Sequence, residues 1–119
     1  MEKTFEQELN ERFNSALKIA ETYPEYKEYL KAGFNVQEKM QGGVVDFKCD
    51  FDPYTPNVVE YTVEFETGYT KKDCLKYKQL IKNEIVKQSP FNEKSFIVDC
   101  GMKYYRWGHF WEWSFIISQ

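Results

Sequence analysis

One short segment, in which acidic residues alternate with large apolar ones, constrains the fold more than any other part of the chain. From Glu60 to Glu66 the sequence reads Glu-Tyr-Thr-Val-Glu-Phe-Glu, with Tyr61, Val63 and Phe65 at every second position. Successive side chains of a β-strand point to opposite faces, so this period predicts a strand with an apolar inner face and an acidic outer face. Such a strand needs a second layer that covers one face and leaves the other in water.

The segment before it repeats the same alternation. Its apolar side chains are predicted to point inward together, and they are Val45, Phe47, Cys49 and Phe51. We expect the two segments to pair as antiparallel strands, because turn-forming residues fill the loop at 52–57 between them. Their shared outer surface would carry six carboxylates, which are our candidate partner-binding residues: Asp46, Asp50, Asp52, Glu60, Glu64 and Glu66. The ordinary alternative is a solvated acidic face that opposes aggregation.

The first forty residues predict two helices and a strand. Apolar residues recur at steps of three and four over Glu2–Glu21, which indicates an amphipathic helix. A second, shorter helix is expected over Pro24–Ala32, because proline suits the first turn and Gly33 follows as a stop signal. Over Phe34–Met40 the period changes to two, which predicts the first strand of a hairpin that turns at Gly42-Gly43.

A third helix and two more strands are expected in the second half. Thr-Lys-Lys-Asp from Thr70 has the spacing of a capping box before an apolar stripe, which predicts a helix over Lys71–Gln88. Strands are expected over Ser95–Cys100 and Tyr104–Ser118, joined at Gly101. Since consecutive strands tend to pair, we predict an α+β fold: an antiparallel sheet of about five strands backed by helices, in the order α-α-β-β-β-α-β-β.

Length, charge and cysteine content restrict the class of protein. A chain of 119 residues that is 42% hydrophobic suits a single domain over residues 1–119. Three widely spaced cysteines argue against a disulfide framework, so a reducing, cytoplasmic location is expected. Neither a signal-peptide pattern nor an apolar run of about 18 residues is present, so no membrane association is expected. A net charge of −3 disfavours direct binding of nucleic acid.

Large rings occupy both faces of the predicted strand Tyr104–Ser118, and Gly108 in its middle suggests a bulge. A strand that is apolar on both faces is expected to lie centrally in its sheet. Trp and Arg are enriched at interface hot spots, so Arg106 and Trp107 join the candidate partner-binding residues. The alternative is a ring-lined ligand pocket formed by five residues: Tyr105, Trp107, His109, Trp111 and Glu112.

Catalytic and cofactor motifs are absent from the sequence. It contains no phosphate-binding loop, dinucleotide fingerprint, nucleophile elbow or His-Glu-x-x-His motif. His109 is the single histidine, and nothing in its spacing from the three cysteines favours a nucleophilic or zinc site. We therefore assign no catalytic residue, no cofactor and no metal ligand, and expect a protein that is not an enzyme.

In size and charge layout the chain is similar in type to small inhibitors encoded by phages and other mobile elements, including anti-CRISPR and DNA-mimic proteins. This resemblance implies a non-catalytic protein whose acidic face docks a basic protein partner, such as a nucleic-acid-binding protein. The alternative is a small-molecule-binding or enzymatic α+β cone, which resembles NTF2-like and cystatin-like domains in its helices, curved sheet and ring-rich last strand. A third possibility is a subunit that oligomerises through the C-terminal strand.

Overall fold

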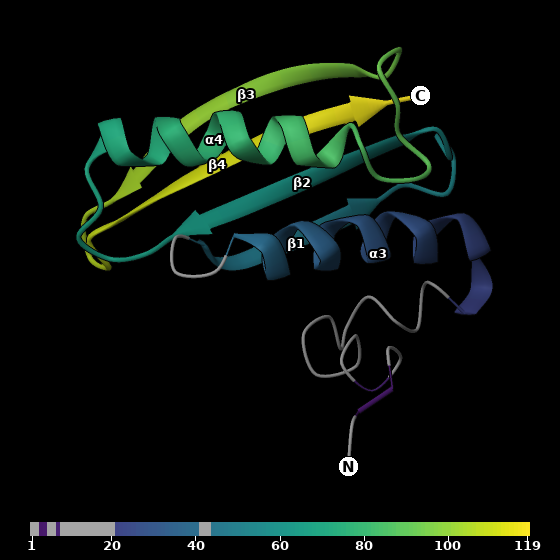
Figure 1. Cartoon of the computed structure of the whole chain (residues 1–119), viewed down its shortest axis with the longest axis horizontal. Helices are drawn as coiled ribbons and strands as arrows, with labels where there is room; N and C mark the ends of the chain where they lie inside the picture. Colours follow the sequence, from purple (N-terminus) through teal and green to yellow (C-terminus); the bar gives the residue numbers. More distant parts are fainter. Residues whose placement is uncertain (1–2, 5–6, 8–20, 41–43) are drawn as a thin grey trace.

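A computed structural model describes residues 3–4, 7, 21–40 and 44–119 of the chain (Figure 1). Labelled as in the figure, its elements are α3 (Pro24–Lys39), β1 (Val44–Phe51), β2 (Val58–Phe65), α4 (Lys71–Ile85), β3 (Phe96–Tyr105) and β4 (Phe110–Ser118). The α+β class is confirmed, but the described sheet has four strands instead of about five. Almost all of the helix expected over Glu2–Glu21 lies outside the described residues.

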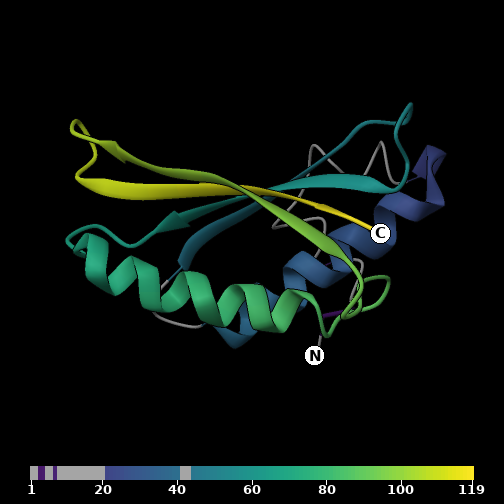
Figure 2. The same cartoon turned by 90° about the horizontal axis from the view of Figure 1, so that it is seen from above.

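The four strands form one antiparallel sheet in the order β1-β2-β4-β3. β4 pairs with β2 on one side and with β3 on the other, so the last strand is central, as its apolar character predicted. Both helices lie against the same side of this sheet (Figure 2). The opposite side, which we call the open face, is covered by neither α3 nor α4.

The strand predicted over Phe34–Met40 is wrong, because α3 continues to Lys39. Phe34 extends a stripe of buried residues at steps of four, which begins at Tyr26 and Leu30. Gly33, expected to end the helix, lies inside it instead. A Cβ atom on this glycine would come within 3.2 Å of the rings of Phe47 and Tyr61, so the missing side chain lets the helix approach the sheet closely.

The predicted boundary between the last two strands is also wrong. The chain does not turn at Gly101, which lies inside β3 with a φ of 94°, where the pairing between β3 and β4 is irregular between Asp99 and Met102. The chain turns instead at residues 106–109, which divide the expected strand Tyr104–Ser118 in two. The Gly108 expected to form a bulge lies in this turn.

The capping box at the start of α4 is confirmed. The Thr70 hydroxyl accepts a hydrogen bond from the Asp73 backbone N–H at 3.2 Å, and the Asp73 carboxylate accepts one from the Thr70 N–H at 3.1 Å. The bonds with Thr70 lower the pKa of Asp73. The helix ends at Ile85, three residues before the predicted end at Gln88.

The core lies between the sheet and the two helices, and its large aromatic residues are fully buried. Those with the largest side chains are Trp113, Tyr29, Tyr61, Phe47, Phe65 and Phe115. The buried tyrosines keep their hydroxyl groups satisfied by donating to backbone carbonyls, as Tyr61 does to Tyr29 at 2.7 Å and Tyr26 does to Cys49. Burial raises the pKa of Tyr61 well above its ordinary value.

Asp99 of β3 ties α4 to the sheet. Its carboxylate forms an ion pair with Lys78 of α4, and it accepts hydrogen bonds from Trp113 Nε1 at 2.8 Å and from the Gly101 N–H at 2.7 Å. Partial burial alone would raise the pKa of Asp99. The bonds from Lys78, Trp113 and Gly101 outweigh that effect, so the pKa lies below its ordinary value.

Candidate functional site: the open acidic face

The strand register places the acidic residues of β1 and β2 in direct opposition. Asp46 is the cross-strand partner of Glu64, and Asp50 is the partner of Glu60. Because residues paired across a ladder share a face, these four carboxylates lie together on the open face. Their neighbours in sequence, among them Phe47 and Val63, are buried on the helix-covered side, as the alternation predicted.

The line of carboxylates continues from β1 and β2 onto β4. Glu64 is paired with Asp46 on one side and with Glu112 on the other, and Glu112 in turn is paired with Lys103 of β3. We call the line of three carboxylates, Asp46, Glu64 and Glu112, the acidic row. Glu112 was not among the predicted carboxylates of the face, because its position depends on pairing between β2 and β4, which are distant in sequence.

The charges of this face are only partly compensated. Directly opposed side chains on antiparallel strands have Cβ atoms about 4.5–5.5 Å apart, and like charges at that spacing destabilise a sheet. On β1 the ammonium of Lys48 lies 3.9 Å from Asp46, and Tyr105 donates a hydrogen bond to Glu112 at 3.2 Å. No ion pair joins Glu60 or Glu64 to any cation of the described ranges. The face therefore presents a negative potential to solvent.

Two predicted carboxylates lie beside the strands instead of on them. Asp52 follows β1 and accepts a hydrogen bond from the Tyr54 N–H at 2.9 Å, and it is exposed in the β1–β2 loop. Glu66 is exposed just beyond the end of β2. The structure thus brings Asp46, Asp50, Glu60 and Glu64 together and places the other two at opposite ends of the same pair of strands.

Arg106 and Trp107 lie in the turn between β3 and β4, and both are exposed. The Trp107 side chain is 83% exposed, yet its ring lies edge-on to Phe110 with centroids 6.0 Å apart. Tyr105 stacks on Phe110 at 5.0 Å, and these two residues are cross-strand partners next to the pair of Lys103 with Glu112. An aromatic cluster of Tyr105, Trp107 and Phe110 therefore borders one end of the acidic row.

The five residues of the predicted ring-lined pocket do not share one face. Trp111 is the partner of Tyr104 and lies on the helix-covered side, with the ammonium of Lys71 5.8 Å from its ring centre. Tyr105 and Glu112 lie on the open face, and His109 occupies the turn with a φ of 53°. The rings of the C-terminal hairpin are thus divided between the two sides of the sheet.

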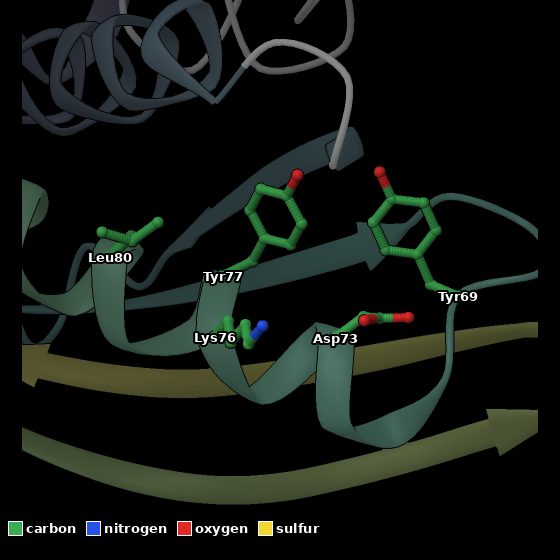
Figure 3. A pocket seen from close by; sticks show the side chains of 5 residues that line it. All are labelled: Tyr69, Asp73, Lys76, Tyr77 and Leu80. Carbon is green, nitrogen blue, oxygen red and sulfur yellow. The ribbon is translucent and has the colours of Figure 1, made fainter.

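Described residues line surface hollows at α4 and on the open face. One, of about 450 Å³, is lined by α4 and the loop before it; Figure 3 shows the hydroxyl groups of Tyr69 and Tyr77 projecting in the same direction there. Hydrogen bonding with Tyr77 raises the pKa of Tyr69 to about 12. The other hollow, of about 270 Å³, lies on the open face, and its lining residues are Asp50, Phe51, Asp52, Thr55, Val58, Glu60 and Ile116.

The cysteines and the histidine are not assembled into one site. Cys49 and Cys74 are buried, and burial raises the pKa of Cys74 to about 11, whereas Cys100 is exposed. His109 contacts the Tyr104 hydroxyl at 3.4 Å. In the ranges that the structure describes, no three His, Cys, Asp or Glu residues are arranged to hold a metal ion. No helix among these residues has the length and apolar character required to cross a membrane.

Comparison with known proteins adds no relative: no protein-family model matches the chain, and no curated protein matches its sequence.

Proposed function

We propose that the protein is a non-catalytic binding protein that docks a basic protein partner through its open acidic face. The observation that carries this proposal is the acidic row, in which Glu64 lies between Asp46 and Glu112 on a side of the sheet that neither α3 nor α4 covers. Cations of a partner would relieve the repulsion between these carboxylates at the moment of docking. Complementary charge also steers encounter and increases the association rate.

The aromatic cluster supports the same proposal. Charged surfaces supply specificity and association rate, while the affinity of most interfaces depends on a few large side chains, with Trp, Tyr and Arg the most enriched. Trp107 projects from the turn at the end of the acidic row, with Arg106 beside it. In this proposal Trp107 anchors the partner and the carboxylates orient it.

The partner class that fits this surface best is a protein with a Lys- and Arg-rich groove, such as a nucleic-acid-binding protein. Carboxylates accept the same charge-assisted, bidentate hydrogen bonds from Arg that phosphates accept. An acidic sheet can therefore occupy a groove that normally holds a nucleic acid. An inhibitor of the kind that phages and other mobile elements encode, acting in the cytoplasm, is the role that we propose for such a surface.

The test is capture of the partner at low and high salt, followed by affinity measurement with charge-reversed variants. The face variant combines Glu60→Lys with Glu64→Lys. The control combines Glu28→Lys with Glu93→Lys, which makes the same change of charge at exposed positions outside the open face. We expect the face variant to lose about tenfold to a hundredfold in affinity, and the control to bind normally. A folded face variant that binds the partner as tightly as wild type would refute the proposal.

A further inference from the structure

The hollow on the open face differs in character from the acidic row. Its volume is about 270 Å³, and it lies near the β1–β2 loop, at the opposite end of the face from Trp107. Val58 and Ile116 contribute apolar surface to it. Asp50 and Glu60, which are direct cross-strand partners, and Asp52 of the loop contribute carboxylates. We call this feature the acidic hollow.

The chemistry of the acidic hollow selects a ligand with an apolar stem and a cationic end. A purely apolar group would leave the carboxylates of Asp50 and Glu60 partly desolvated without partners, which is unfavourable. A small inorganic cation would gain nothing from Val58 and Ile116. Basic side chains combine the two properties, because their methylene stems pack on apolar surface while the charged group reaches a polar rim.

The arrangement of the carboxylates favours arginine over lysine. Asp50 and Glu60 face each other across the β1–β2 ladder, so their carboxylate groups approach the hollow from two neighbouring strands. A guanidinium has five N–H donors in a planar fork and can bond two carboxylates at once. An ammonium is a compact, strongly hydrated charge that gains less from such a pair.

We propose that the acidic hollow is a subsite for one arginine side chain of the basic partner, with its stem on Val58 and Ile116 and its guanidinium between Asp50 and Glu60. This inference rests on the proposed function and deepens it, because it names the residue type that the face recognises and the place where it binds. The acidic row then supplies general attraction, and the acidic hollow fixes the register of the partner on the sheet.

The experiment uses n-butylguanidinium as a probe, added to the full chain while the NMR signals of Val58 and Ile116 are followed. We expect saturable shifts at both residues. Glu60→Gln is expected to weaken the binding about tenfold, since it removes a charge-assisted bond. Glu93→Gln is the control: it removes one exposed carboxylate outside the open face, and it should leave the binding unchanged.

Two further probes complete the design. Guanidinium without an alkyl stem and n-butylammonium should both bind more weakly than n-butylguanidinium. Shifts that do not saturate, equal weakening by the two Gln variants, or tighter binding of n-butylammonium would each overturn the arginine subsite. None of these outcomes bears on whether charge reversal at Glu60 and Glu64 weakens partner binding, so the failure of the subsite and the failure of the proposed function are distinguishable.

Discussion

Glu64 of β2 is the direct cross-strand partner of Asp46 of β1, and two carboxylates therefore face each other across one ladder. Glu112 extends the line on the other side of Glu64. Opposed like charges destabilise a sheet, whereas Thr or Gln at the same positions would not. The open face therefore carries repulsion that works against the stability of the sheet.

Replacing Glu64 with Gln is expected to stabilise the protein. The substitution removes repulsion from both Asp46 and Glu112 while it keeps the size of the side chain, and the expected gain is about 0.5–1 kcal/mol in the free energy of unfolding. Urea unfolding at low and at high salt measures this change. The gain should shrink at high salt because screening weakens the repulsion in wild type. An unchanged or reduced stability at low salt would contradict the prediction.

Replacing Asp99 with Asn is expected to destabilise the protein by roughly 1–2 kcal/mol at neutral pH, because it removes the ion pair with Lys78 and weakens the bond from Trp113. In the folded wild type the pKa of Asp99 lies below its ordinary value. The unfolded state therefore takes up this proton first, and the stabilisation is present above about pH 4 and lost as the pH falls further.

Chemical unfolding across the acid range tests this dependence. Wild type should lose stability relative to the Asp99→Asn variant as the pH falls through the range in which Asp99 titrates. Glu93→Gln, at an exposed carboxyl in the loop after α4, serves as the control and should follow wild type. Parallel pH profiles for wild type and the Asn variant would show that Asp99 does not supply this stabilisation.

Tyr61 is expected to set a limit on stability at alkaline pH. Burial raises the pKa of Tyr61 in the folded state, so the unfolded state loses this proton first as the pH rises. The stability is therefore unaffected below the ordinary pKa of about 10 and falls as the pH rises above it. Tyr61→Phe should cost about 1 kcal/mol at neutral pH because it removes the hydrogen bond that the Tyr61 hydroxyl donates to the Tyr29 carbonyl, and it should weaken the alkaline dependence. Tyr54, which is 93% exposed, provides the control variant Tyr54→Phe, which should match wild type.

Replacing Gly33 with Ala is expected to destabilise the protein although alanine is the better helix former. The helix gains about 1 kcal/mol in propensity. The added methyl group would lie 3.2 Å from the rings of Phe47 and Tyr61, which are fully buried, and overpacking of a core costs about 1–3 kcal/mol. Thermal unfolding should show a lower midpoint; a higher one would mean that the two rings relax.

The parts of the fold that the sequence predicted correctly are those whose signals are local. Alternation along β1 and β2 placed Phe47 and Val63 inside and their acidic neighbours outside, and the capping box marked the start of α4. Phe34 and Val36 misled the prediction. Apolar residues two positions apart fit one face of a strand, but both can also be buried by a helix that has a wide apolar face. Gly33 also misled the prediction. A glycine is needed there because of tertiary packing, since the rings of Phe47 and Tyr61 lie close to where a side chain would be, and not because the helix ends.

The candidate site likewise has residues that local sequence signals predicted and residues that depend on long-range strand pairing. Asp46, Asp50, Glu60 and Glu64 could be placed on one surface from two neighbouring segments, since a hairpin brings them together. Glu112 could not be placed on this surface from the sequence, because the sequence does not reveal which strand pairs with β4. In the structure that strand is β2. The acidic hollow could not be predicted for the same reason, because Ile116 lies beside Glu60 only through the pairing of β2 with β4.

The central place of β4 has a consequence during synthesis. Until the ribosome has added Phe110–Ser118, the β1–β2 hairpin has a free edge at β2, and β3 has no strand to pair with. Free edges and unpaired strands invite pairing with other chains. The nascent protein therefore exposes an unpaired strand edge until β4 has been translated, and the carboxylates already present on β1 and β2 make nascent chains repel one another.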